Sequence, residues 1–400
     1  MGKPVSALEK YQRTFALLGR ASAVGHSRSL LRVLHVSLSS GFGGKELRIL
    51  NEMLAMRDRG HTLEVVCAAR SELGQRSQNH GFRTHHIEVE GLIASAMTPF
   101  RIGGIVRGGD FDVVNTHSVE DDLRAALFAR LARTRLVVRT HHRESRLHVP
   151  RLSGAVSGHV ITVSTYQRQR YLERGHFEQR VRTIPTGLDV QYPRPAMPSM
   201  RQELAIPDDA IVIGNVADDQ DAQGLRILVE AMYPLMEVYP QVHLVLGGLH
   251  EPRLNQLRRR AVEIGLIGRI HFPDFFFCVG DLLGAVDIYA MVPECEVLGS
   301  TFVEASASGV PVVATAVGCL PEVIENGVSG YVVLPFDRVI LRSVINNLIV
   351  ESSLRSRFGK AGRANFVLRE RFSAAKMAES IEDAYLGWLN VRADKAGVGR

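Results

Sequence analysis

The chain has 400 residues, which is enough for two domains with separate cores. Its 46% hydrophobic and 22% charged residues are typical of a globular protein and exclude a low-complexity or short-repeat protein. No apolar run reaches the roughly 18 residues that cross a bilayer. Arg20 interrupts the apolar run that begins at Phe15, so we expect no signal peptide and a cytoplasmic location.

Charge is distributed unevenly along the chain. Residues 1–200 hold 29 Lys and Arg against 17 Asp and Glu (+12), and residues 201–400 hold 19 against 25 (−6), which together give +6. A basic half favours an anionic partner, such as a membrane surface or a phosphorylated lipid-linked acceptor. A solvated basic surface without a partner is the alternative. Nucleic acid is not expected, because no recognised binding motif accompanies the charge.

From Leu31 onwards, short β-rich runs alternate with helical patterns, which predicts a parallel sheet covered by helices. Strands are expected over residues 33–36, 63–66, 113–115, 136–138 and 160–163, with a helix over residues 45–59. Four prolines then fall between positions 193 and 207, where strand and helix cannot continue easily. We therefore place a linker at residues 193–208.

A second alternating series follows the linker. Its expected strands cover residues 211–213, 242–246, 270–272, 287–290, 312–314 and 330–333, and its expected helices cover 225–236 and 254–264. A last amphipathic helix covers 373–389, with a stripe of Met377, Ile381, Tyr385 and Trp388. The predicted organisation is a basic extension (1–30), a first doubly wound domain (31–192), the linker, a second domain (209–372), and the terminal helix and tail (373–400). Ligands of such domains bind at the carboxyl ends of the strands, so the site is expected in a cleft between the domains.

Two carboxylates, Glu296 and Glu304, stand eight positions apart around an expected loop-to-helix junction. Gly299 lets a ligand approach the backbone closely, and amides from Gly299 through Ser300 to Thr301 would point at an anion. Because carboxylates accept hydrogen bonds from hydroxyls, this arrangement suits a sugar joined to a phosphate. Two solvated glutamates on a surface helix are the alternative if the pair is considered alone.

The order of the neighbouring motifs resembles the retaining, nucleotide-sugar-dependent glycosyltransferases of family 4. The signature is present as Glu296…Glu304-Ala305, Gly-Val-Pro-Val-Val-Ala at 309–314, Gly-Cys-Leu-Pro-Glu at 318–322, and Asn326-Gly327…Gly330-Tyr331. The resemblance implies the GT-B fold: two Rossmann-like domains that face each other across a cleft, with the terminal helix crossing back to the first domain. It further implies that Glu296 contacts the donor sugar, the amides of 299–301 the sugar and diphosphate, and Glu304 the ribose.

The first domain carries weaker motifs of the same family. Gly43 and Gly44 lie between the first strand and the first helix; by themselves they fit a simple turn as well as an anion site. By resemblance this loop faces the donor phosphates and the acceptor. His117 follows the strand at 113–115, and the resemblance implies that it acts with Glu296 as a polar contact to the donor sugar or acceptor.

Arg139, His141 and His142 follow another expected strand and resemble an Arg-Thr-Arg-His segment of some bacterial relatives. With further basic residues up to position 148 they predict a cationic loop on the acceptor side. Asp110 and Asp112 mimic a metal-binding pair but precede their strand, so they lie at the wrong end of it. The histidines lack a carboxylate partner or a firm spacing. We expect no metal and no cofactor; the nucleotide sugar is a substrate.

The family pattern breaks at the start of the second domain. Asp218 stands where relatives have an arginine, and Gln223 where they have a lysine, the two cations that hold the donor diphosphate. Losing two charge-assisted hydrogen bonds costs about 3–6 kcal/mol. A carboxylate about 4 Å from a phosphate adds about 4 kcal/mol of repulsion at an effective dielectric constant near 20. Arg226, Lys45 or a base of the 139–146 loop could substitute.

The sequence therefore predicts an enzyme that moves a sugar from a nucleotide diphosphate sugar to a cell-surface glycan or lipid-linked acceptor, of the lipopolysaccharide or exopolysaccharide type. Its basic half places it at the inner face of the plasma membrane as a peripheral protein. The alternative is a degenerate, non-catalytic GT-B protein that binds a glycan, a lipid or a partner glycosyltransferase; Asp218 and Gln223 favour it, and the intact glutamate pair argues against it.

Overall fold

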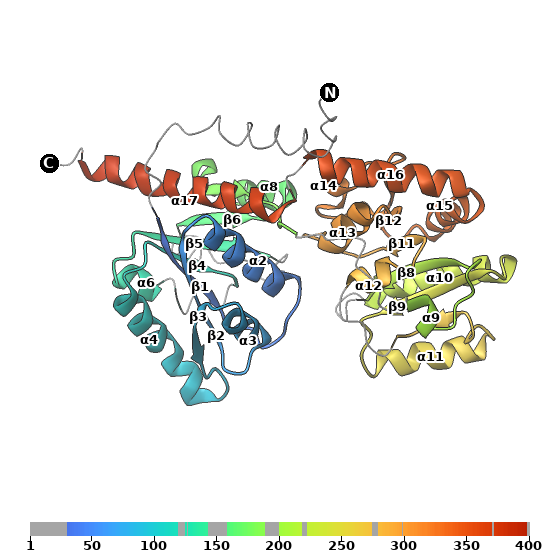
Figure 1. Cartoon of the computed structure of the whole chain (residues 1–400), viewed down its shortest axis with the longest axis horizontal. Coiled ribbons are helices and arrows are strands. Elements are labelled where there is room, and N and C mark those ends of the chain that lie inside the picture. The colour runs from blue at the N-terminus through green and yellow to red at the C-terminus, as the bar shows by residue number, and fades with distance from the viewer. Residues whose placement is uncertain are drawn as a thin grey trace, which may run out of the picture.

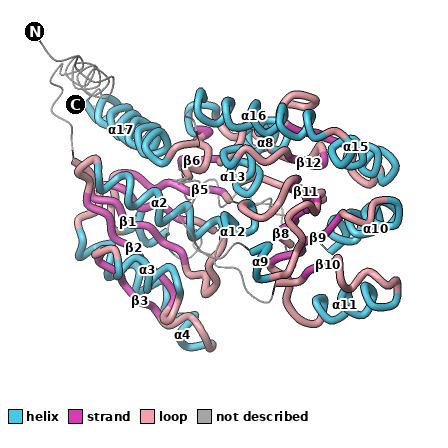
Figure 2. The backbone as a smooth tube through the Cα atoms, turned by 45° about the vertical axis from the view of Figure 1, so that its right-hand side comes forward, coloured by secondary structure: helices cyan, strands magenta, loops and turns pink. Residues whose placement is uncertain are grey.

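The computed structural model describes residues 30–118, 125, 127–142, 158–188, 200–217, 222–273, 279–297, 299–369 and 372–397. It contains two parallel sheets, each covered by helices, in two domains that lie side by side (Figures 1 and 2). Among these residues no helix is both long and apolar enough to cross a membrane.

The first domain is built on a seven-stranded sheet with the order β3-β2-β1-β4-β5-β6-β7. Its strands are β1 (Arg32–Ser37), β2 (Thr62–Ala68), β3 (Arg83–Ile87), β4 (Val113–Thr116), β5 (Leu136–His141), β6 (His159–Thr162) and β7 (Val181–Thr183). Its helices are α2 (Gly44–Asp58), α3 (Glu72–Asn79), α4 (Leu92–Gly109), α6 (Leu127–Leu131) and α8 (Thr165–Glu173), with a 3-10 turn at Glu178–Arg180. The apolar residues buried in these strands are mostly valine and leucine, as expected for a sheet covered on both faces.

The second domain is built on a six-stranded sheet with the order β10-β9-β8-β11-β12-β13. Its strands are β8 (Ile211–Val216), β9 (Val242–Gly247), β10 (Ile270–His271), β11 (Ile288–Met291), β12 (Val312–Thr315) and β13 (Gly330–Val333). Its helices are α9 (Met200–Glu203), α10 (Ala222–Val238), α11 (Arg253–Glu263), α12 (Val279–Leu283), α13 (Ser300–Ser308), α14 (Leu320–Val323), α15 (Arg338–Val350) and α16 (Ser352–Arg369).

The last helix, α17 (Ala374–Gly397), leaves the second domain and lies along the first (Figure 1, red). Its predicted stripe of Met377, Ile381, Tyr385 and Trp388 is buried in one core cluster with residues of α2 and the first sheet. The Trp388 indole donates a hydrogen bond to the Gln179 carbonyl (3.0 Å). The expected crossing helix is thus confirmed.

Every expected strand is present, but β3 and β7 are absent from the sequence prediction. Both are edge strands, each paired with a single neighbour. Edge strands are short or partly exposed and therefore lack a strong apolar signal. The expected linker also differs at its end: Met200 and Ile206 pack into the core of the second domain, so the part of the linker from residue 200 belongs to that domain.

The strand order reverses between β1 and β4 in the first sheet and between β8 and β11 in the second. Ligands of doubly wound sheets bind at the carboxyl end of such a switch point. Gly43 and His117 follow β1 and β4, and Gln223 and Glu296 follow β8 and β11. The topology therefore puts both groups of predicted ligand-binding residues where this fold binds ligands.

Candidate active site

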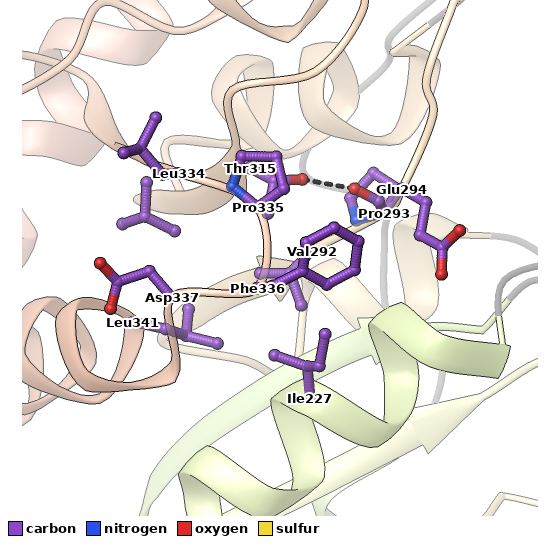
Figure 3. Close-up of a pocket in the computed structure, with 11 residues that line it drawn as sticks. Ile227, Val292, Pro293, Glu294, Thr315, Leu334, Pro335, Phe336, Asp337 and Leu341 are labelled. Atoms are coloured by element: carbon purple, nitrogen blue, oxygen red, sulfur yellow. Dashed lines mark hydrogen bonds between the residues drawn. The ribbon is translucent and has the colours of Figure 1, made fainter.

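The loop after β11 holds Glu296 in one position. One carboxylate oxygen of Glu296 accepts hydrogen bonds from the amides of Val297 (2.9 Å) and Gly299 (3.0 Å). Gly299 has φ +62°, a left-handed conformation that favours glycine, and α13 begins directly after it. Earlier in the loop, the Thr315 hydroxyl donates to the Pro293 carbonyl at 2.6 Å (Figure 3). The half-buried carboxylate is thus presented by a fixed backbone.

A second loop packs against the backbone of Glu296. The Cys319 amide donates to the Glu296 carbonyl oxygen (2.9 Å), and a Cβ at position 318 would lie 1.6 Å from that oxygen. Gly318 also has φ +52°. Only glycine fits there, which gives a physical reason for the glycine that opens the run at 318–322.

Glu304 lies on the second turn of α13 and is half-buried. Tyr289 connects it with Glu296: burial raises the pKa of the Tyr289 phenol, and the carboxylates of Glu296 and Glu304 raise it further. The phenol donates a hydrogen bond to the Met291 sulfur (3.4 Å), and the Thr301 side chain opposes the rise in its pKa. Glu296 is held at the N-terminus of α13 by the Gly299 amide, and Glu304 lies on the second turn of the same helix. Both carboxylates therefore lie near the first-turn amides from Ser300, which have no partner within the helix.

Only part of the altered phosphate site lies within the residues that the structure describes. Asp218 lies outside the described residues, and Gln223 is exposed on the first turn of α10, just beyond the carboxyl end of β8. Of the candidate substitutes, Arg226 is paired with Glu230 (3.7 Å), and Lys45 is paired with Glu46 (3.0 Å). The effect of Asp218 and Gln223 on phosphate binding stays a prediction.

A shallow pocket lies beside this loop, lined by the ends of β11, β12 and β13 and by α10 and α15 (Figure 3). It measures about 270 Å³ with the open solvent at its mouth included. Ligand pockets measure roughly 300–1,000 Å³. Phe336 and Ile227 line it, whereas the Glu294 carboxylate points away from these side chains, so the pocket offers few polar groups to a ligand.

The glycine loop of the first domain begins α2. The Gly43 amide donates to the Glu46 carboxylate (3.0 Å), so a protein carboxylate already occupies one of the anion-binding positions of this helix N-terminus. Gly44 opens the helix, and Lys45 follows it with its ammonium group on Glu46. The loop therefore combines a glycine backbone that is already bonded to Glu46 and Leu47 with one cation and one anion.

His117 lies directly after β4 and is buried. Both of its ring nitrogens are engaged: Nε2 is 2.9 Å from Nδ1 of His35, and Nδ1 is 2.9 Å from Nε2 of His142. We call His35, His117 and His142 the histidine row. Its inner end points towards Glu52 of α2, whose carboxylate is 3.9 Å from Nε2 of His35. His35 and Glu52 are not among the residues expected at the site, because they stand inside otherwise apolar patterns.

Arg139 and His141 differ from their prediction. The sequence predicts a cationic loop here, but β5 continues through His141, and both side chains are buried in the sheet. Burial and the nearby Arg139 lower the pKa of His141 to about 3, so the ring is neutral and bonded to the Tyr171 hydroxyl (3.1 Å). The part of the loop beyond His142, residues 143–157, lies outside the described residues.

Asp112 has a structural role: its carboxylate accepts hydrogen bonds from the Arg32 amide (3.0 Å) and the Arg135 guanidinium (2.8 Å). Asp110 lies at the end of α4, where φ is +48°. In the described part of the chain, no three histidine, cysteine or acidic side chains are arranged to hold a metal ion.

Glu322 connects the two domains. From α14 of the second domain, its carboxylate accepts hydrogen bonds from the amides of Thr165 (3.0 Å) and Tyr166 (2.7 Å), which open α8 of the first domain. A carboxylate at a helix N-terminus is favourable for both partners. The end of the signature run at 318–322 therefore holds the two domains in contact.

Replacing Glu322 by alanine should free these two amides. Hydrogen bonds to charged groups contribute about 1.5–3 kcal/mol, so hydrogen exchange at Thr165 and Tyr166 should become at least about tenfold faster. Glu325→Ala is the matched control, because its exposed carboxylate contacts Asn365 within the second domain. Unchanged exchange in Glu322→Ala would show that the contact is not formed in solution.

The fold and the two switch points define a class of protein: a GT-B protein with two Rossmann-like domains and candidate ligand-binding residues at the carboxyl ends of both sheets. Comparison with known proteins identifies the family. The model "Glycosyl transferases group 1" matches residues 197–365, and the model "Glycosyltransferase Family 4" matches residues 42–192. The chain belongs to the family 4 glycosyltransferases, which confirms the predicted family and fold.

Individual relatives agree with this assignment. The chain is 25% identical to a D-inositol 3-phosphate glycosyltransferase of Stackebrandtia nassauensis, over 92% of this chain and 94% of that protein. It is 32% identical to the lipopolysaccharide core biosynthesis glycosyltransferase LpsE of Rhizobium meliloti, over 47% of this chain and 52% of that protein. Anabaena Alr3699/HepE in complex with UDP-glucose has a similar fold (TM-score 0.76, 21% identity, 89% of this chain and 100% of that one).

Proposed function

We propose that the protein is a retaining glycosyltransferase that moves a sugar from a nucleotide diphosphate sugar to a cell-surface glycan or lipid-linked acceptor. The observation that carries this proposal is that Glu296 is bonded to the N-cap residue of α13, whose next turns carry Glu304, at the switch point of the second sheet. Two carboxylates can accept hydrogen bonds from sugar and ribose hydroxyls. The free amides of the helix N-terminus can donate hydrogen bonds to the diphosphate, which joins the sugar to the ribose.

In this mechanism the donor binds to the second domain and the acceptor to the first. The first-turn amides of α13 stabilise the negative charge that develops on the leaving diphosphate. In a reaction on one face of the sugar, the leaving phosphate can take the proton of the acceptor hydroxyl, so the protein need not supply a nucleophile. Gln223 can donate a hydrogen bond but brings no charge, which predicts weaker leaving-group stabilisation than a lysine would give.

A non-catalytic GT-B protein is the second candidate, and the pair Asp218 and Gln223 favours it. The two candidates differ in turnover. We would incubate the protein with UDP-glucose, GDP-mannose or ADP-glucose and membrane glycolipids, and measure nucleoside diphosphate release. The enzyme should release diphosphate with one donor and give a product whose anomeric configuration matches the donor's. Tight donor binding without release would favour the second candidate.

We further propose that the protein acts in the cytoplasm, at the inner face of the plasma membrane, and that α4 makes the contact. The first turns of α4 expose apolar side chains: Leu92 is 93% exposed, Ile93 82% and Phe100 63%. Arg101 and Arg107 are exposed farther along the same helix, and α4 lies at the outer side of the first domain (Figure 1). Exposed apolar residues beside cations are typical of a helix that binds an anionic lipid surface.

Replacing Leu92, Ile93 and Phe100 by serine should therefore abolish binding to anionic vesicles. Burying each such side chain contributes about 1.5–3 kcal/mol, so the three changes together should lower the partition coefficient by at least about 100-fold. Flotation with phosphatidylglycerol vesicles measures it. A variant with Val238→Ser and Val262→Ser is the control, because both valines are similarly exposed (67% and 60%) on the second domain. Equal loss in the control would overturn the assignment to α4.

A further inference from the structure

The histidine row crosses the carboxyl edge of the first sheet from β1 to β5. His35, His117 and His142 are 0%, 2% and 4% exposed, and each neighbouring pair of rings is joined by an N···N contact of 2.9 Å. Since each contact needs one N–H and one lone pair, the protonation of one ring fixes that of the next. The position of the proton on the ring at one end of the row therefore fixes its position on the ring at the other end.

All three rings are neutral. Burial, and Arg48 after it, lowers the pKa of His35 to about 3. Burial also lowers the pKa values of His117 and His142 well below the ordinary histidine value. A neutral imidazole has one donor and one acceptor nitrogen. Only two proton arrangements satisfy both contacts: every ring carries its proton on Nε2, or every ring carries it on Nδ1.

Glu52 selects the first arrangement. With the proton on Nε2, the N–H of His35 faces the Glu52 carboxylate at 3.9 Å; with the proton on Nδ1, a lone pair would face it instead. Burial raises the pKa of the Glu52 carboxyl group. The Arg48 guanidinium (3.9 Å), the Tyr385 hydroxyl (3.4 Å) and the Asn115 amide (3.5 Å) oppose this shift and favour the carboxylate. Attraction between the carboxylate and an N–H therefore sets the tautomer of the whole row.

At the other end of the row, His142 must then present a lone pair on Nδ1. This nitrogen is buried and has no hydrogen-bond partner among the described residues. It lies near the start of α2, since Lys45 and Arg48 are both close enough to lower the pKa of His142. A buried acceptor without a donor is unfavourable, so a donor from a ligand would satisfy it.

We propose that His142, through Nδ1, accepts a hydrogen bond from a sugar hydroxyl of the bound substrate, and that His117, His35 and Glu52 are positioning residues that hold Nδ1 unprotonated. His117 has no free ring nitrogen for a ligand, so the ligand contact expected of it falls to His142. A lone pair cannot bind a phosphate oxygen, and a hydroxyl is the donor that a sugar brings. This inference rests on the proposed transferase function.

The tautomer can be tested without substrate, by 15N spectra of histidine-labelled protein at pH 7. The wild type should show unprotonated Nδ1 and protonated Nε2 in all three rings of the row. In Glu52→Gln, which keeps the shape but removes the charge, the Nδ1 signal of His142 should move towards the protonated position. The internal control is a second histidine pair, in the second domain, where Nδ1 of His243 is 2.9 Å from Nε2 of His271. The 15N signals of this pair should not change. A protonated Nδ1 in wild-type His142 would overturn the proposal.

The ligand contact is tested by adding UDP-glucose, GDP-mannose or ADP-glucose, each alone and together with membrane glycolipids as acceptor, to the same sample and following the Nδ1 signal of His142. A shift with the donor that binds supports the contact. With that donor, His142→Ala should lower transfer at least about tenfold, and His142→Asn, which keeps an acceptor near the Nδ1 position, should restore part of it. Donor turnover without any shift or loss would overturn the contact and leave the transferase function intact. No binding of any donor, with the expected tautomer, would overturn the transferase function and the contact with it.

Discussion

Replacing Glu304 by alanine should weaken binding of the nucleoside diphosphate sugar by about 10- to 100-fold. The carboxylate lies on the second turn of α13, where it would accept hydrogen bonds from ribose hydroxyls. A hydrogen bond to a charged group contributes about 1.5–3 kcal/mol, and each 1.4 kcal/mol changes the dissociation constant tenfold. Titration calorimetry with the cognate donor measures the change directly.

Glu294→Ala is the matched control for this change. Glu294 is an exposed carboxylate two residues before Glu296, and its side chain points away from the pocket that it borders (Figure 3). Donor affinity should be the same as in the wild type. If wild type and Glu304→Ala bind the donor equally well, Glu304 does not contact the ribose. If Glu304→Ala and Glu294→Ala lose the same donor affinity, the effect is a general one of negative charge.

Acid should destabilise the protein steeply below about pH 6. The pKa values of His35 and His141 are both lowered to about 3 by burial, whereas an unfolded histidine titrates near 6.5. Between these values the unfolded state binds protons that the native state does not, so stability is full above about pH 6.5 and falls as the pH falls towards 3. Each histidine contributes about 1.4 kcal/mol per pH unit in this range.

Two such histidines should lower the free energy of unfolding by about 3 kcal/mol between pH 6 and pH 5, a large share of the roughly 5–15 kcal/mol of a typical domain. Urea unfolding at each pH measures this slope. The double variant His141→Phe, Tyr171→Phe removes one of these rings together with its hydrogen-bond partner, and its slope should be smaller by about one proton. A free energy of unfolding that is constant from pH 7 to pH 5 would contradict the buried neutral histidines.

The second-domain half of the site could be predicted from sequence because its parts are local. Glu296, Gly299 and Glu304 belong to one loop and one helix, and Gly318 packs on the same backbone. These residues lie within one segment of about 25 residues. The order and spacing of the motifs are therefore enough to predict how the residues are arranged.

The histidine row could not be predicted in this way. His35 and His117 are 82 positions apart, and Glu52 reaches them from a helix that reads as an ordinary amphipathic segment. Only the parallel register, in which β1 pairs with β4 and β4 with β5, brings the three rings together. The end of β5 illustrates the same limit: a polar Arg-Thr-His run reads as a loop, but pairing with β6 extends the strand through His141.

The carboxyl edge of the second sheet should bind a nucleotide sugar although Asp218 and Gln223 replace two cations. Titration calorimetry of the full chain with UDP, GDP, ADP and their sugars tests it most directly. We predict that one nucleotide and its sugar bind, and that Gln223→Lys, which restores a cation beside α10, binds the diphosphate at least about tenfold more tightly. Absence of binding to every nucleotide, in both the wild type and Gln223→Lys, would contradict the donor site.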